Sequence, residues 1–264
     1  MGMLSLEEFE QIHARYEAGT ANTQDLEQLE PYRAKRAVLL ASGFGSRMMP
    51  ITINTPKPLV RVNGKRIIAT IIEALYAIGV EEIHIVVGYL AQEFELLKLE
   101  YPNIDLIYNP LYASTNNISS AIKAKEHFQN AYVFESDLYL RNPQVLKRYN
   151  YCSYYLGVPV QSTQDWCFDT QDGIITDLHK GGTSCHHMFG ISYWTQKDGA
   201  RLAQDLPVAF EESDANKQRF WDDVPCVLMK KNYRIAIKEC AFSDIAEIDS
   251  FAELQDIDPQ YKII

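Results

Sequence analysis

The sequence has no apolar run that approaches the ~20 residues a membrane-spanning helix requires. It also lacks an excess of positive charge: its net charge is −10, which argues against broad binding to nucleic acid. The first fifteen residues are acidic and amphipathic, and they contain no apolar signal-peptide core. We therefore expect a cytoplasmic protein with no membrane span and no nucleic-acid partner.

Cysteine is scarce and unpatterned. The five cysteines are far apart, and no Cys-x-x-Cys motif is present. An odd number of scattered cysteines is typical of reduced thiols in a cytoplasmic protein. Cys185-His186-His187 invites a metal interpretation, but adjacent residues rarely converge on one ion without distant ligands. We therefore predict no metal there.

Two common phosphate-binding motifs are also missing. The glycine pair Gly43-Phe44-Gly45 has Met48 where a dinucleotide fingerprint needs its third glycine. No Gly-Lys-Ser/Thr follows it, as a Walker A loop would require. Three prolines, at positions 50, 56 and 58, also prevent a long helix from starting directly after the loop.

The glycine pair nevertheless stands in an informative place. It follows the apolar residues 37–40, which predict a buried strand. A glycine-rich turn after a strand exposes backbone N–H groups that can hold phosphate. Arg47 and Lys57 add two positive charges close by. The combination predicts a site for a nucleoside triphosphate.

Strands and helices alternate along the first half of the domain. Apolar patterns predict strands at 37–41, 82–87, 105–108 and 131–135, and helices at 67–78, 92–101 and 118–127. Such alternation is typical of an α/β fold with a Rossmann-like mixed, mainly parallel sheet flanked by helices. Ligands of such sheets bind beyond the carboxyl ends of the strands. The glycine loop, Gly88 and Asp137 would meet at that edge.

The two ends of the chain differ from this pattern. Residues 1–34 are predicted as an N-terminal helical extension, and residues 35–264 as a single domain. The extension would dock on that domain or on a second subunit, as in a homodimer, or remain partly mobile. Residues 151–160, 167–169, 174–179 and 187–194 are predicted as short strands of a β-rich subregion, followed by a helix at 199–206.

Two aspartates lie at predicted strand ends. Asp137 follows the strand at 131–135, and Asp249 follows the apolar segment 245–248. A transferase that uses a triphosphate needs a divalent ion to neutralise the leaving pyrophosphate, and hard cations prefer carboxylate oxygens. Asp137 and Asp249 could therefore clamp one Mg²⁺, although on this pattern alone a pair of surface carboxylates is the more common case.

The motif Leu-Ala-Ser-Gly-Phe-Gly-Ser-Arg at 40–47, followed by Thr-Pro-Lys-Pro-Leu at 55–59, resembles the sugar-phosphate nucleotidyltransferase superfamily. With the segments around Gly88, Asn117, Asp137, Trp194, Trp221 and Asp249, the chain is similar to bacterial CTP:phosphocholine cytidylyltransferases of the LicC type. The resemblance runs from Ala37 to about Leu254. It implies transfer of CMP from CTP to phosphocholine by Mg²⁺-assisted in-line displacement, which gives CDP-choline and pyrophosphate.

The resemblance also implies roles for individual residues. Arg47 and Lys57 would be the catalytic cations, and Asp137 and Asp249 would hold Mg²⁺. The nucleotide would contact Leu40, Ala41, Ser42, Gly43, Gly45, Gly88 and Asn117. Ser42 replaces the more usual alanine, and Glu135 stands where relatives often have aspartate, which puts a second-ion role for that position in doubt.

The acceptor is predicted from the chemistry of choline. A quaternary ammonium has no N–H group and is bound by aromatic cages. The resemblance implies that some subset of the aromatic residues in the matching segments forms such a cage. The predicted acceptor-binding residues are Trp166, Tyr193, Trp194, Trp221 and Asp222.

Other acceptors stay open. A primary ammonium, as in 2-aminoethylphosphonate or phosphoethanolamine, would depend more on Asp165, Asp222 or Glu212. A sugar 1-phosphate would need more hydroxyl-binding side chains. The nucleotide base is also open, and so is a non-catalytic, nucleotide-binding regulatory protein.

Overall fold

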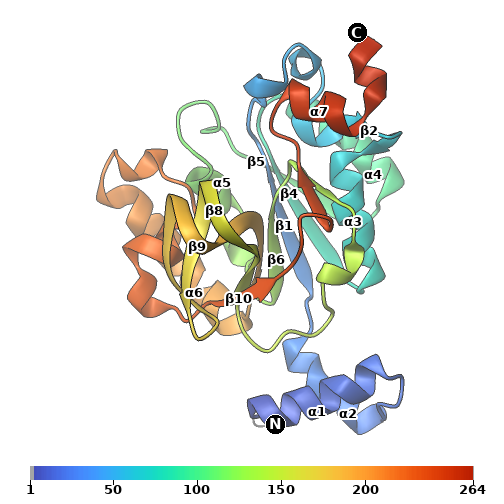
Figure 1. The fold of residues 1–264 in the computed structure, drawn as a ribbon, viewed down its shortest axis with the longest axis vertical. Helices are drawn as coiled ribbons and strands as arrows, with labels where there is room; N and C mark the ends of the chain where they lie inside the picture. Colours follow the sequence, from blue (N-terminus) through green and yellow to red (C-terminus); the bar gives the residue numbers. More distant parts are fainter. Residues whose placement is uncertain (1–2, 264) are drawn as a thin grey trace.

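The computed structural model describes residues 3–263. Its centre is a seven-stranded sheet with the order β10-β8-β9-β6-β1-β4-β5 (Figure 1). These strands are β1 (Arg36–Ala41), β4 (Glu82–Val87), β5 (Ile104–Tyr108), β6 (Ala131–Glu135), β8 (Tyr154–Gln171), β9 (Ile174–Trp194) and β10 (Ala236–Glu239). Two small sheets pair β2 (Arg61–Val62) with β3 (Lys65–Arg66), and β7 (Leu138–Leu140) with β11 (Ile245–Glu247).

The α/β architecture expected from the alternating pattern is confirmed. β1 pairs in parallel with both β4 and β6, and β4 pairs in parallel with β5. The two antiparallel neighbours are β6–β9 and β8–β9, so the sheet is mixed and mainly parallel. The predicted strands at 37–41, 82–87, 105–108 and 131–135 match β1, β4, β5 and β6 to within one residue.

Helices cover both faces of the sheet. The remaining elements are α1 (Leu6–Glu17), α2 (Thr23–Leu29), α3 (Ile67–Ala77), α4 (Leu97–Glu100), α5 (Ile118–Lys123), α6 (Gln196–Glu212) and α7 (Phe251–Ile257). Leu39 of β1 faces the core formed with α3, whereas Val38 faces the core formed with α5 and α6. This alternation follows from the two-residue period of a strand and leaves β1 buried on both sides.

Helix boundaries differ from the sequence pattern in three places. The helix predicted at 118–127 is shorter, because α5 ends at Lys123 and is followed by the 3₁₀ turn Lys125–His127. The helix predicted at 92–101 is a 3₁₀ segment, Ala91–Leu96, that continues into the single turn of α4. The helix predicted at 199–206 is longer: α6 begins after the Thr195 cap, whose side chain accepts a hydrogen bond from the Asp198 N–H, and continues past Pro207. Tertiary packing of its apolar face outweighs the local breaker.

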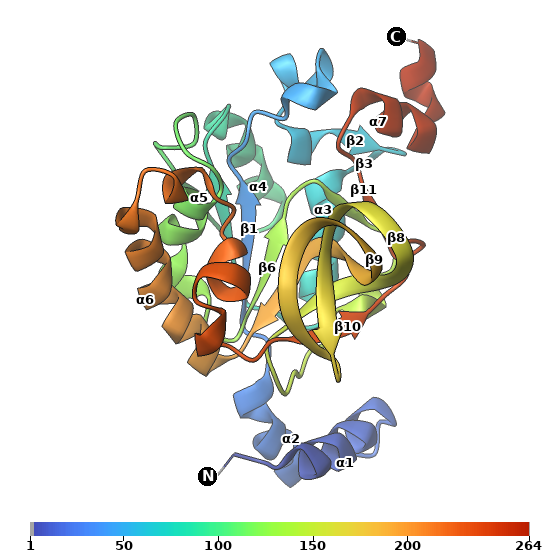
Figure 2. The same cartoon turned by 60° about the vertical axis from the view of Figure 1, so that its left-hand side comes forward.

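The β-rich subregion departs most from expectation. The four predicted short segments are parts of two long strands, β8 and β9, that curl together into a hairpin (Figure 2). Asp172 and Gly173 close the hairpin with φ of 51° and 73°. Several register shifts between the strands bend the ribbon, as β-bulges do. The hairpin therefore begins in the central sheet and reaches beyond it.

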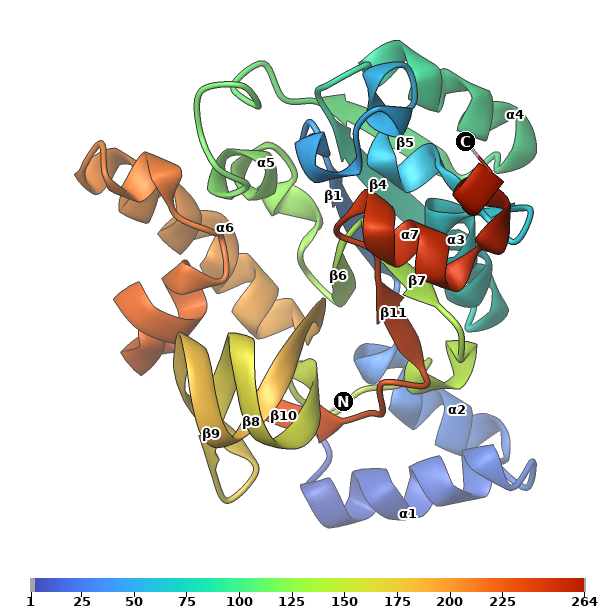
Figure 3. The same cartoon turned by 45° about the horizontal axis from the view of Figure 1, so that its top comes forward.

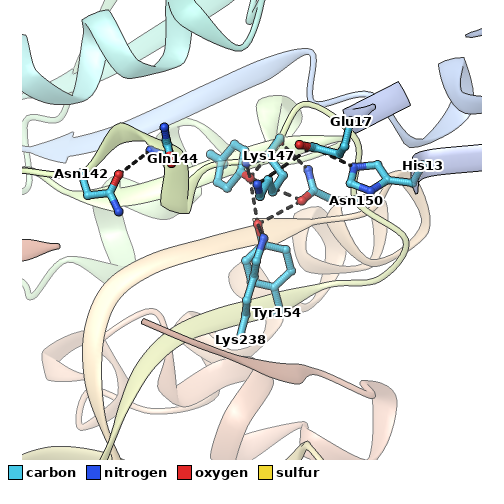
Figure 4. A network of polar contacts seen from close by, with 9 residues as sticks. His13, Glu17, Asn142, Gln144, Lys147, Asn150, Tyr154 and Lys238 are labelled. Carbon is cyan, nitrogen blue, oxygen red and sulfur yellow. Dashed lines mark hydrogen bonds and ion pairs between the residues drawn. The ribbon is translucent and has the colours of Figure 1, made fainter. Parts of the chain in front are cut away.

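The N-terminal helices pack on their own chain. Capping boxes at Ser5 and Asn22 start α1 and α2. Phe9 and Ile12 of α1 pack against Tyr149 of the domain. Figure 4 shows the polar side of this contact, where Lys147 Nζ lies 3.9 Å from a carboxylate oxygen of Glu17. The predicted helices are confirmed, and a role in dimerisation stays a prediction.

Within residues 3–263, no helix combines the length and the apolar character that crossing a bilayer requires.

Candidate active site

The glycine-rich loop forms one wall of a cleft of about 420 Å³ at the carboxyl end of β1. Gly45 has φ of 61°, in the left-handed region that favours glycine. A Cβ at Gly45 would lie 3.0 Å from Cβ of Lys57 and 3.2 Å from Cγ2 of Thr52. The hydroxyl of Thr52 donates to the Gly45 carbonyl at 2.8 Å. The second glycine of the pair thus lets Lys57 approach the loop closely.

Lys57 lies at the centre of the charged floor of the cleft. Its Nζ is 2.8 Å from Oδ2 of Asp137 and 2.8 Å from Oδ1 of Asp249. Burial alone would lower the pKa of Lys57, but the two carboxylates outweigh it and raise the pKa above its usual value. Arg47 reaches Oδ2 of Asp249 at 2.8 Å with a largely exposed side chain. The two predicted cations and the two predicted metal ligands therefore meet at one point.

A third carboxylate completes this cluster. Ligand oxygens of Asp137, Glu247 and Asp249 all lie within 4.8 Å of one another. Oδ1 of Asp137 is buried and has no hydrogen-bond partner in the part of the chain that the structure describes. β11 brings Glu247 to this edge by pairing with β7, as Figure 3 shows. An all-carboxylate set with an unpaired buried oxygen fits a hard divalent cation.

The sequence interpretation missed Glu247, although a signal was present. Glu247 and Asp249 are two residues apart at a strand end, so their side chains point to the same side. Burial, together with the charges of Asp137 and Asp249, raises the pKa of Glu247 to about 8. A cation bound by Glu247 would displace the proton that the raised pKa keeps on its carboxyl group.

The other end of the cleft is held by a buried hydroxyl network. Oγ of Ser42 lies 2.7 Å from Oγ of Ser120, and Asn109 donates to the hydroxyl of Ser120 at 2.9 Å. The hydroxyl of Ser42, which replaces the more usual alanine of the loop, thus has a buried hydrogen-bond partner. Gly88 does not line the cleft. A Cβ there would lie 2.6 Å from Cβ of Tyr112, so glycine allows Tyr112 to form part of the wall.

Asn117 lies at the junction of the cleft with a second cavity. Its Nδ2 donates to Oε1 of Glu135 at 3.2 Å, and its Oδ1 accepts from the Trp221 N–H at 2.8 Å. Of the predicted nucleotide, catalytic and metal-binding residues, all except Gly88 line the first cleft: Leu40, Ala41, Ser42, Gly43, Gly45, Arg47, Lys57, Asn117, Asp137 and Asp249.

The second cavity, of about 60 Å³, is strongly acidic. It shares Glu135 and Phe220 with the first cleft, so the two adjoin. Its lining is Glu135, Asp165, Trp166, Leu178, Met188, Gly190, Phe220, Asp222, Asp223 and Glu247. A Cβ at Gly190 would lie 2.5 Å from Cγ of Glu135, so glycine makes room for that carboxylate.

Burial governs the titration of the acidic side chains in this cavity. It raises the pKa of Asp222 to about 7, against the stabilising hydrogen bond that the Tyr155 hydroxyl donates at 2.6 Å. Burial and the charge of Asp137 raise the pKa of Glu135 well above its usual value. A cation that enters beside these carboxyl groups would stabilise their ionised form.

The predicted aromatic cage is corrected here. Tyr193 and Trp194 are fully buried and Trp221 is 2% exposed. None of the three lines either cavity. Tyr193 and Trp194 stand on β9 opposite β6, in the middle of the sheet, where helices and neighbouring strands cover both faces. Only Trp166 and Asp222 of the predicted acceptor set face the second cavity, with Phe220 edge-to-face on Trp166 at 5.6 Å.

Comparison with known proteins identifies the family. The Nucleotidyl transferase family model matches residues 36–148. A 2-aminoethylphosphonate cytidylyltransferase of Lancefieldella rimae is 38% identical over 229 residues, which cover 85% of this chain and 92% of the relative. The chain belongs to the nucleotidyl transferase family. This nucleotidyltransferase is therefore an enzyme of the class that the glycine-rich loop predicts.

Two further relatives connect the nucleotidyltransferase to the resemblance noted from its motifs. A choline-phosphate cytidylyltransferase of Streptococcus pneumoniae is 29% identical over 227 residues, covering 84% of this chain and 96% of the relative. The structure of the CTP:phosphocholine cytidylyltransferase LicC from Streptococcus pneumoniae matches with a TM-score of 0.79 and 30% identity, over 86% of this chain and 99% of that one. Both of these proteins are named for phosphocholine, whereas the Lancefieldella rimae relative is named for 2-aminoethylphosphonate.

Proposed function

We propose that this nucleotidyltransferase transfers CMP from CTP to a small acceptor with a phosphonate or phosphate at one end and a primary ammonium at the other. 2-Aminoethylphosphonate is the acceptor of this kind that we favour. The observation that carries the proposal is the acidic second cavity, which adjoins the cleft that holds Lys57 and Arg47. An ammonium in the second cavity places the acceptor's phosphonate at the junction with the cleft.

The phosphocholine expected from the sequence rested on the family resemblance and on an aromatic cage built from some of Trp166, Tyr193, Trp194 and Trp221. Only Trp166 of these faces the second cavity, whereas Asp165, Asp222 and Glu135 line it together. Carboxylates bind a primary ammonium through charge-assisted hydrogen bonds that a quaternary ammonium cannot donate. The 38% identity to a 2-aminoethylphosphonate cytidylyltransferase supports the same choice.

The reaction is a direct displacement. An anionic oxygen of the acceptor attacks the α-phosphorus of CTP in line, a new P–O bond forms, and the bond to the β-phosphate bridging oxygen breaks to release pyrophosphate. The attacking oxygen is already ionised, so no general base is needed. Lys57 and Arg47 hold the triphosphate and stabilise the charge that develops on the phosphoryl oxygens. Mg²⁺ held by Asp137, Glu247 and Asp249 would neutralise the leaving pyrophosphate.

Phosphocholine stays a second candidate for one specific reason. Trp166 and Phe220 present two aromatic rings beside Asp165 at the cavity, and such rings attract quaternary ammonium. The structural likeness to LicC favours it as well.

The deciding experiment measures pyrophosphate release with Mg²⁺. CTP, UTP, ATP and GTP are each combined with 2-aminoethylphosphonate, phosphoethanolamine, phosphocholine and glucose 1-phosphate. We expect the highest kcat/KM with CTP and 2-aminoethylphosphonate. A higher value with phosphocholine would overturn the acceptor and keep the cytidylyl transfer. Folded protein that binds CTP but releases no pyrophosphate with any acceptor would favour the regulatory alternative.

The division of the chain and its location belong to the same proposal. We treat residues 35–264 as the nucleotidyltransferase domain and residues 1–34 as an extension, since α1 and α2 lie outside the helical layers of the sheet (Figure 1). All five cysteines are free thiols, which supports a reducing, cytoplasmic location.

A further inference from the structure

A second group of metal-ligand side chains lies at the opposite end of the sheet from the active site. His84 and Glu82 belong to β4, Asp105 to the neighbouring β5, and His127 to the 3₁₀ turn Lys125–His127 that precedes β6. One ligand atom from each of Glu82, His84 and His127 lies within 4.8 Å of the other two. Val38, opposite His84 in the sheet register, is four residues from Ser42, or about 13 Å along the strand.

His84 is the member of this group whose surroundings are least satisfied. The residue is 8% exposed, and neither ring nitrogen has a hydrogen-bond partner among the described residues. Its nearest carboxylate oxygens are 3.5 Å from Nδ1, on Asp105, and 3.7 Å from Nε2, on Glu82. A buried polar atom left unpaired destabilises the folded state, and a cation bound at a ring nitrogen would remove that destabilisation.

We propose that Glu82, His84 and His127 bind a divalent transition metal of the Zn²⁺ class, with Asp105 beside them as a further carboxylate. Imidazole nitrogen together with carboxylate oxygen is a ligand set that suits zinc. It contrasts with the all-carboxylate cluster of the active site, which suits Mg²⁺. The two sites therefore select different metals.

Binding requires a local rearrangement. The rings of His84 and His127 are stacked, with centroids 3.5 Å apart and planes inclined by 24°. Nitrogen lone pairs lie in the ring planes, so stacked rings cannot both point at one ion. His127 is only half-buried and stands on a single turn, so its ring is the one that turns. Arg36, whose Nε lies 2.7 Å from Glu82, must release that carboxylate.

Zinc binding to the full chain tests the proposal. Metal-free protein is titrated with Zn²⁺ by calorimetry in excess Mg²⁺, which occupies the active-site carboxylates. We expect one equivalent of Zn²⁺ to bind, and His127→Gln and His84→Gln each to weaken binding at least about tenfold because one ligand of a small set is lost. His127→Gln should fold normally and keep its CTP turnover, because the residue is half-buried and far from the cleft.

Two controls make the result specific. His186→Gln removes another strand histidine beside a carboxylate, since Nε2 of His186 lies 3.3 Å from Glu239, and it should leave zinc binding unchanged. Co²⁺ in place of Zn²⁺ should show no thiolate charge-transfer absorption. The proposal is wrong if no equivalent of Zn²⁺ binds, if His186→Gln weakens binding as much as His127→Gln, or if the cobalt spectrum reports cysteine ligands.

Discussion

The two adjoining cavities of this nucleotidyltransferase differ in the charges that line them, because cations line only the first. The first cleft places Lys57 and Arg47 among backbone N–H groups of a turn, which suits a polyanion. The second cavity gathers five carboxyl groups around two aromatic rings, which suits a cation. A zwitterionic acceptor matches this pair of cavities, because its anionic end belongs at the junction and its cationic end in the acidic cavity. In the proposed reaction, charge more than shape would orient the acceptor for attack.

The strongest test removes the cation of the first cleft. Lys57→Ala should lower kcat by at least about 10²–10³-fold, because a charge aimed at the developing phosphoryl charge is lost. Asp137→Asn should have an effect of similar size with Mg²⁺ saturating. Steady-state pyrophosphate release gives kcat for both variants. Near-normal turnover of both would remove the first cleft from the chemistry, provided that circular dichroism and thermal melting show folded protein.

A substitution in the second cavity should affect KM for the acceptor rather than KM for CTP. Asp222→Asn keeps an oxygen that can accept from the Tyr155 hydroxyl but removes the charge. We expect KM for 2-aminoethylphosphonate to rise at least about tenfold, because the ammonium loses a buried charged partner, while KM for CTP stays within about twofold. Asp172→Asn, at the exposed tip of the β8–β9 hairpin, is the matched control and should change neither constant. Equal changes in both KM values would mean that Asp222 does not separate acceptor from nucleotide.

The two cavities also differ in how far the sequence could predict them. The first is made largely by one continuous loop and by residues at strand ends, so Lys57, Asp137 and Asp249 could be placed from local pattern and topology. The second takes Asp165 and Trp166 from the β8–β9 hairpin and other residues from three distant segments. No local sequence pattern predicts which of these residues lie together in the cavity.

The misplaced cage has an identifiable physical cause. Successive residues of a strand face opposite sides, so Tyr193 and Trp194 could not both face one ligand. Tyr193 packs with Tyr132 and Tyr154 on one side of the sheet, and Trp194 packs with Trp221 on the other. The sequence shows this alternation, but it does not show that β9 is an interior strand with both faces covered.

The pH dependence of stability should reveal the third carboxylate of the cluster. The pKa of Glu247 is raised to about 8 by burial and neighbouring carboxylates. From about pH 5 to about pH 8 the native protein holds a proton that the unfolded chain has released, so the free energy of unfolding falls as pH rises. In metal-free protein we expect a loss of about 1–3 kcal/mol over this range.

Denaturant unfolding at several pH values measures that slope. Glu247→Gln cannot ionise and should make the slope shallower, with Asp222 and Glu135 supplying the part that remains, whereas the exposed Glu10→Gln should not change it. Mg²⁺ should stabilise the native protein more at pH 8 than at pH 6, because it binds the ionised carboxylates that the proton would otherwise occupy. A slope that Glu247→Gln leaves unchanged would place the titrating group elsewhere.

The smallest expected effect is that of Tyr193→Phe, which tests whether the ring of Tyr193 packs in the core or binds the acceptor. Tyr193→Phe removes only a hydroxyl whose contact, with Oδ1 of Asn130, is long at 3.4 Å. The ring still fills the core between Tyr132 and Tyr154, so the free energy of unfolding should fall by no more than about 1 kcal/mol. KM should stay unchanged for 2-aminoethylphosphonate and for phosphocholine, because the ring faces neither cavity. A selective rise in KM for either acceptor, with stability retained, would return Tyr193 to the acceptor site and restore the cage.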